Sequence, residues 1–199
     1  FPLSRESEAK LAAALAVIPP LNEQAMGNLT GNARDLWVTG AGTIRKQLDS
    51  TYARAMKAVW KEFGNDAEVG TLYAEALMLL EPRRGTWELA KPSIREIHQV
   101  LEHILARDIT HPGACHLYVH ATESTVVPGK AEACAEFLGA SIPGASHINH
   151  MPSHTWNEIG RWNDGVRANI QAWHSDLKAA IGEGFAIYPD HNLHMLLFA

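Results

Sequence analysis

The sequence is poor in cysteine, in charge of one sign and in long hydrophobic runs, and each shortage excludes a class of protein. Two cysteines, Cys115 and Cys134, are too few for a disulfide framework, so we expect both to be small core residues within helices. The 17 basic and 22 acidic residues give a net charge of −5, without the basic face that nucleic acids require. No apolar run approaches the length of a membrane span. We therefore expect neither a nucleic-acid nor a membrane partner.

Strand signals are also scarce, whereas helical periodicity covers most of the chain. Glycines at 27, 31, 40 and 42 interrupt any period early in the sequence, so residues 20–48 are expected to form an irregular connection. Helix, short turn and helix then alternate, which predicts an all-α fold. The helices are expected at residues 4–18, 49–63, 66–80, 93–106, 112–123, 128–138, 144–154, 161–181 and from Asp190 onward.

The two ends of the sequence suggest where the protein resides and how much of it is present. Glu6 and Glu8 precede the apolar stretch 11–18 and no small-residue cleavage site follows it, so we interpret the stretch as a helix and expect a cytoplasmic protein. The chain begins with Phe1 and ends at Ala199 within an apolar run. We expect residues 1–199 to be a single domain and a piece of a longer protein.

Histidine is the residue that stands out. Eight of the 11 histidines lie in three segments, at residues 111–120, 147–154 and 191–194. On a helix, positions three, four and seven apart share a face, so each segment would carry a stripe of imidazoles. Neutral imidazole is the commonest protein ligand for transition metals, and facing stripes can build a metal site between helices. The candidate ligands are His116, His120, Glu123, His147, His150, His154, His191 and His194.

A repeated string supports a stacked helical architecture. The residues Pro-Gly-Ala-Cys-His at 112–116 recur as Pro-Gly-Ala-Ser-His at 143–147, near the period of tetratricopeptide repeats. The strings HPGACHLYVHATES, HINHMPSHTWNEIGRWNDGVRAN and YPDHNLH also resemble a family of bacterial and fungal tetratricopeptide-repeat-like proteins. The resemblance covers roughly residues 49–199. Members of this family carry further helices beyond the last motif. It implies antiparallel helical hairpins stacked as an α-solenoid and leaves the activity open.

Several candidate positions have a structural alternative. His116 and His120 can instead hydrogen-bond to neighbouring side chains, and Glu123 can orient an imidazole rather than bind metal. Pro152 should kink the second helix or begin a new one near residue 151, which leaves the directions of its histidines open. His191 and His194 either complete the site or lie exposed near the chain end.

The remaining histidines and tyrosines are expected to have other roles. His111 precedes a proline and is expected to cap a helix, whereas His98, His103 and His174 are assigned to structure or surface. Tyr118 and Tyr188 are near enough in sequence to the histidines to line a pocket.

The residue types in the candidate site limit the choice of metal ion and of function. One carboxylate among many imidazoles disfavours magnesium and calcium, and two irons in a bundle usually use several glutamates. Copper is favoured over zinc, and a copper-dependent oxidoreductase with an unknown small-molecule substrate is the leading hypothesis. Two alternatives stay open: a repeat scaffold that binds a protein partner in its groove, with structural histidines, and a protein for metal storage or delivery.

Overall fold

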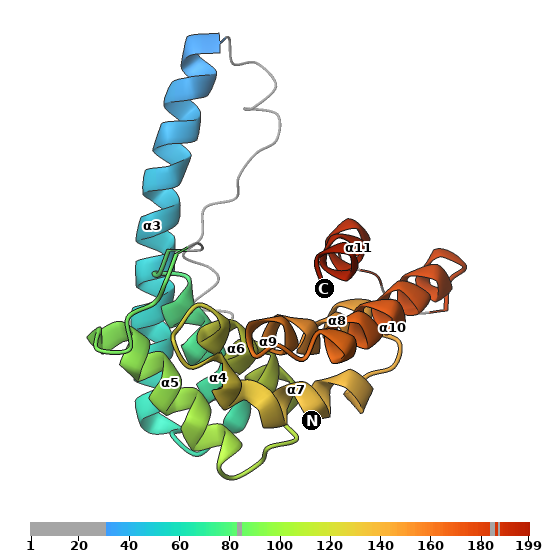
Figure 1. Cartoon of the computed structure of the whole chain (residues 1–199). Coiled ribbons are helices and arrows are strands. Elements are labelled where there is room, and N and C mark those ends of the chain that lie inside the picture. Colours follow the sequence, from blue (N-terminus) through green and yellow to red (C-terminus); the bar gives the residue numbers. More distant parts are fainter. Residues whose placement is uncertain (1–30, 83–84, 184–185, 187) are drawn as a thin grey trace.

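The protein is all-helical in a computed structural model that describes residues 31–82, 85–183, 186 and 188–199, with side chains from residue 45 onward (Figure 1). Within these residues there is no strand, as predicted, and helices follow one another with short connections. The elements are α3 (Gly31–Glu62), α4 (Ala67–Met78), α5 (Pro92–Leu105), α6 (Pro112–Glu123), the 3₁₀ helix η1 (Pro128–Ala131), α7 (Glu132–Ser141), α8 (Ser146–His150), α9 (Pro152–Glu158), α10 (Trp162–Ala180) and α11 (Pro189–Phe198).

Helix α3 begins far earlier than the sequence pattern predicts. Residues 31–48, expected to belong to an irregular connection, are helical and extend away from the other helices in Figure 1. A glycine inside a helix costs only about 1 kcal/mol relative to alanine, so the scattered glycines lower helix propensity without ending the helix. The rest of that connection and the helix expected at residues 4–18 lie outside the described residues.

The first layers of the fold follow the predicted boundaries. Asp66 caps α4, because its side chain accepts a hydrogen bond from the backbone N–H of Val69 at 3.0 Å. Helix α5 begins at Pro92, whose missing N–H is not needed in a first helical turn. The predicted apolar stripe of α5 is buried and includes Ile94, Ile97, Leu101 and Leu105. Helix α4 packs between α3 and α5, and α5 packs on α6.

The two cysteines differ from the expectation of separate core residues. Both are buried, at 0% and 1% exposure, but Cys115 of α6 and Cys134 of α7 are joined by a disulfide bond. They are 19 residues apart, on helices that pack against each other. Sequence spacing alone does not show which helix faces meet, so it does not reveal this pairing.

The second half of the molecule contains a helix break and an unusual helix start. Helix α8 ends at His150 and α9 begins at Pro152, which confirms the new start predicted at the proline. Helix α11 begins at Pro189 after Tyr188, whose φ of 59° is left-handed, so Asp190 is not its N-cap as the sequence suggested.

The packing of these short helices brings distant segments together. Helix α6 packs against α9, and α8 packs against both α10 and α11. Figure 1 shows α8, α9 and α10 side by side with α11 above them. The described helices include none with both the length and the hydrophobicity needed to cross a bilayer.

Candidate metal centre

The first histidine stripe lies on α6, whose start is fixed by its own sequence. His111 is the N-cap, and its Nδ1 accepts a hydrogen bond from the backbone N–H of Ala114 at 3.1 Å, which confirms the predicted capping role. Pro112 occupies the first helical turn. The helix carries His116, His120 and Glu123, all half-buried, toward the region between α6 and α9.

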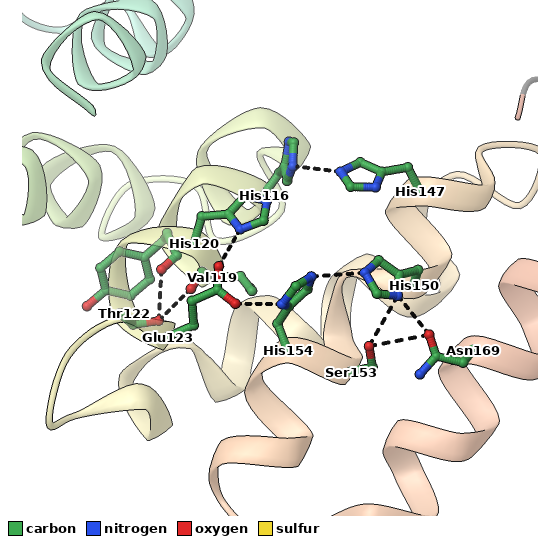
Figure 2. Close-up of polar contacts among 11 residues, drawn as sticks. His116, Val119, His120, Thr122, Glu123, His147, His150, Ser153, His154 and Asn169 are labelled. Carbon is green, nitrogen blue, oxygen red and sulfur yellow. Dashed lines mark hydrogen bonds and ion pairs between the residues drawn. The ribbon is translucent and has the colours of Figure 1, made fainter. Parts of the chain in front are cut away.

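The second stripe is divided between α8 and α9. The imidazole of His150 is fully buried, whereas His147 and His154 are partly buried. His154 lies beyond the helix break, yet its Nε2 is 2.9 Å from Nε2 of His150 (Figure 2). The break at Pro152 therefore changes the helix axis without separating these two rings.

The third segment contributes one histidine and leaves the other outside. His191, on α11, has its ring centroid 4.6 Å from that of His150. His194 is exposed and belongs to none of the close groups of potential ligands among the described residues. Seven of the eight predicted ligands are thus brought together, and His194 is not.

Two groups of three histidines share no member. The first triad is His116, His120 and His147, and the second triad is His150, His154 and His191. In each, the three potential ligand nitrogens all lie within 4.8 Å of one another. The ring centroids of His120 and His154, one from each triad, are 5.2 Å apart, so the triads are neighbours.

The spacing of nitrogen atoms within the triads suits a shared ion. Nε2 of His116 and Nε2 of His147 are 3.3 Å apart, and the corresponding pair in the second triad, His150 and His154, is 2.9 Å apart. A tetrahedral ion with metal–nitrogen bonds of about 2.0–2.1 Å holds two ligand nitrogens about 3.3 Å apart. The separation of 3.3 Å in the first triad matches this value, and the separation of 2.9 Å in the second is shorter.

Glu123 lies between the two triads and contacts both (Figure 2). Its Oε1 is 2.6 Å from Nδ1 of His120, and its Oε2 is 2.5 Å from Nδ1 of His154. An ionised carboxylate only accepts hydrogen bonds, so both Nδ1 atoms carry the proton. The Nε2 atoms of both rings are then left with lone pairs available to a metal.

The buried ring of His150 is oriented by a residue that the sequence analysis did not identify. Nδ1 of His150 is 2.7 Å from Oδ1 of Asn169, while Nδ2 of Asn169 donates to the carbonyl of Gly165 at 2.9 Å. That second bond fixes the amide with its oxygen toward the imidazole. The sequence does not single out Asn169, because Ser175 and Asp176 are also polar residues buried on α10.

The hydrogen bonds of His150 and His154 leave the second triad in an arrangement that a bound cation would stabilise. His150 and His154 both donate through Nδ1, so two Nε2 lone pairs face each other at 2.9 Å. An extra proton between them would place a positive charge where burial lowers the pKa of His150 to about 3. A bound metal ion would satisfy both lone pairs and keep the imidazoles neutral.

Burial also lowers the pKa values of three further imidazoles of the centre. It lowers the pKa of His116 to about 3 and that of His147 to about 4, with neighbouring histidines adding to the shift. Burial also lowers the pKa of His191. Burial raises the pKa of Glu123, but hydrogen bonds from His120 and His154 outweigh it and bring that pKa to about 2. The centre therefore combines several imidazoles whose pKa values are lowered by burial with one carboxylate whose pKa is also lowered.

The other predicted pocket and structural residues fall at different places. The exposed Tyr188 lies at the rim, its ring edge toward His147 at a centroid distance of 5.9 Å. Tyr118 donates from its hydroxyl to Glu102 at 2.7 Å, and its ring packs against that of His98 in the core. His103 and His174 contact Trp60 and Trp173, as expected of structural or surface residues.

Comparison with protein-family models, with curated proteins and with solved structures finds no match to this chain.

Proposed function

We propose that this protein is a metal-dependent enzyme whose centre holds two metal ions, one in each histidine triad, with copper favoured over zinc. The observation that carries the proposal is the pair of separate three-histidine groups, in each of which two Nε2 atoms lie 3.3 Å or 2.9 Å apart. The stacked hairpins of a tetratricopeptide-like array would serve as the scaffold that supports these helices.

The ligand chemistry supports copper. Imidazole suits both copper and zinc. Three imidazoles and a water also make a catalytic zinc site, so zinc is the alternative metal. Here both oxygens of Glu123, the carboxylate next to the triads, are already used by imidazole N–H groups. The two triads therefore offer nitrogen ligands alone, and such a site binds Cu²⁺ more tightly than Zn²⁺.

The proposed chemistry is oxidation of a small organic substrate by dioxygen. Copper held by the two triads would supply one electron from each ion, and dioxygen would take up two electrons and two protons to reach the level of hydrogen peroxide. The reduced substrate would return two electrons and two protons. His116, His120 and His147 would hold one ion, and His150, His154 and His191 would hold the other next to it.

Element-resolved mass spectrometry of the native protein tests the metal content. The proposal predicts two copper ions per chain, and loss of one of them in a His150→Ala, His154→Ala double variant. A native protein without stoichiometric metal would contradict the proposal and favour the scaffold with structural histidines.

Dioxygen uptake tests the chemistry and separates an enzyme from a storage or delivery protein. The copper-loaded protein, reduced anaerobically and then mixed with dioxygen, should consume one dioxygen per two copper ions. The zinc-loaded protein is the matched control and should consume none. Copper that is released to a competing chelator within seconds, without dioxygen uptake, would instead indicate delivery.

A further inference from the structure

The Glu123 carboxylate has an arrangement that a simple metal ligand or a surface glutamate would not need. Its side chain is 25% exposed, and within the described part of the chain its side-chain partners are the imidazoles of His120 and His154 rather than a lysine or an arginine. One carboxylate oxygen accepts from Nδ1 of His120 in the first triad, and the other accepts from Nδ1 of His154 in the second. Each triad thus depends on a different oxygen of the same group.

We propose that Glu123 is a shared positioning residue that couples the two triads into one two-metal centre. The inference rests on the proposed function and adds to it the means by which the two sites depend on each other. By accepting Nδ1–H from both rings, the carboxylate sets both tautomers and aims both Nε2 atoms at their ions. It also places one negative charge between two cations, which reduces their mutual repulsion.

The proposal predicts that replacing Glu123 with glutamine affects the two triads differently. A glutamine side chain has one acceptor oxygen and one donor –NH₂ group. Glu123→Gln can therefore accept from only one of the two imidazoles, and its –NH₂ faces the other Nδ1–H. That second ring must turn away or move its proton to Nε2, which removes its lone pair from the metal. One triad is expected to keep its geometry while the other loses it.

Titration of the protein with zinc, followed by calorimetry, tests this coupling. Zinc has no redox chemistry and, like copper, binds well to imidazole. Wild-type protein should bind two equivalents. In Glu123→Gln, one equivalent should be unchanged and the other weakened about 10- to 100-fold, the usual cost of losing an outer hydrogen-bond partner. In Glu123→Ala, both equivalents should weaken, since neither ring keeps its acceptor. Glu136→Gln, at an exposed glutamate on α7 that pairs with Arg161, is the matched control and should bind like wild type.

Long-range ¹H–¹⁵N spectra of the zinc-loaded protein add a readout that a purely structural role would not change. Wild type should show protonated Nδ1 and metal-bound Nε2 on both His120 and His154. The glutamine variant should keep this pattern on one ring alone. If either variant fails to fold, the spectrum of the wild-type protein still tests the proposal. An unprotonated Nδ1 on either His120 or His154 would overturn it.

The other outcomes are distinguishable. Wild type that binds fewer than two zinc ions would contradict the proposed function itself. Wild type that binds two, together with a glutamine variant that binds both unchanged, would overturn only the coupling. If Glu123→Ala lost one bound zinc completely and kept the other unchanged, Glu123 would be a direct metal ligand. That result would also overturn the proposed coupling.

Discussion

The Nε2 atoms of His116 and His147 lie 3.3 Å apart, although the two residues are separated by 31 positions in the sequence. They are the last residues of the two matching strings at 112–116 and 143–147. The internal repeat therefore places its equivalent histidines face to face, one from α6 and one from α8. The first triad therefore joins one histidine from each copy of the repeated string to His120 of α6.

Replacement of His147 should remove one metal ion and leave the other. His147→Ala takes a ligand from the first triad and none from the second, so copper content should fall from two ions to one. His194→Ala is the matched control, because His194 is an exposed histidine outside both triads. Element analysis checks both variants. Loss of metal in His194→Ala, or retention of two ions in His147→Ala, would show that the triads are wrongly assigned.

The metal-free protein should lose stability as the pH falls from 7 to 5. The pKa values of His116, His147 and His150 are about 3, 4 and 3 in the folded protein, against an ordinary value of about 6.5. The unfolded chain therefore binds more protons in this window. The contribution to stability is complete above pH 6.5 and is lost as the pH falls through the folded values.

Urea unfolding of the metal-free protein at pH 7, 6 and 5 measures this dependence. His147→Ala should show a shallower decline than wild type, because one titrating group with a lowered pKa is gone. A free energy of unfolding that stays constant or rises over this range would contradict the burial of neutral imidazoles.

Gly70→Ala should destabilise the protein even though alanine favours helices. A Cβ atom at Gly70 in α4 would lie 2.7 Å from a ring carbon of Trp60 and 2.8 Å from Cδ1 of Ile104. Overpacking of this kind costs about 1–3 kcal/mol, which exceeds the gain of about 1 kcal/mol in helix propensity. Gly139→Ala in α7 is the control, since its nearest new contact is 3.6 Å and only the favourable effect should remain. Denaturant unfolding of both variants should give changes of opposite sign.

Much of the fold follows from the sequence because its causes are local. Asp66, Pro92 and Pro112 mark helix starts by capping or by their missing N–H, and the stripe of α5 matches its buried face. The extent of α3 was not predicted, because glycine lowers helix propensity without forbidding a helix. The spacing of the histidines indicated which segments carry the candidate ligands that the fold brings together. The division into two triads, the bridging place of Glu123 and the role of Asn169 depend on how helices pack, which periodicity does not contain.

The Cys115–Cys134 bond predicts a protein without free thiols. Alkylation in denaturant followed by intact-mass analysis should detect no modified cysteine until a reductant is added. Closing a loop of this length is worth about 3 kcal/mol in the chain-entropy model, so reduction should lower the free energy of unfolding by a similar amount. Two free thiols in protein isolated under oxidising conditions would contradict the pairing.

Anomalous X-ray diffraction from crystals of the copper-loaded protein, recorded at the copper absorption edge, tests the central claim most directly. The account predicts two peaks, one bounded by the Nε2 atoms of His116, His120 and His147 and the other by those of His150 and His154 with a nitrogen of His191. A single peak, or peaks that lie away from these imidazoles, would contradict it.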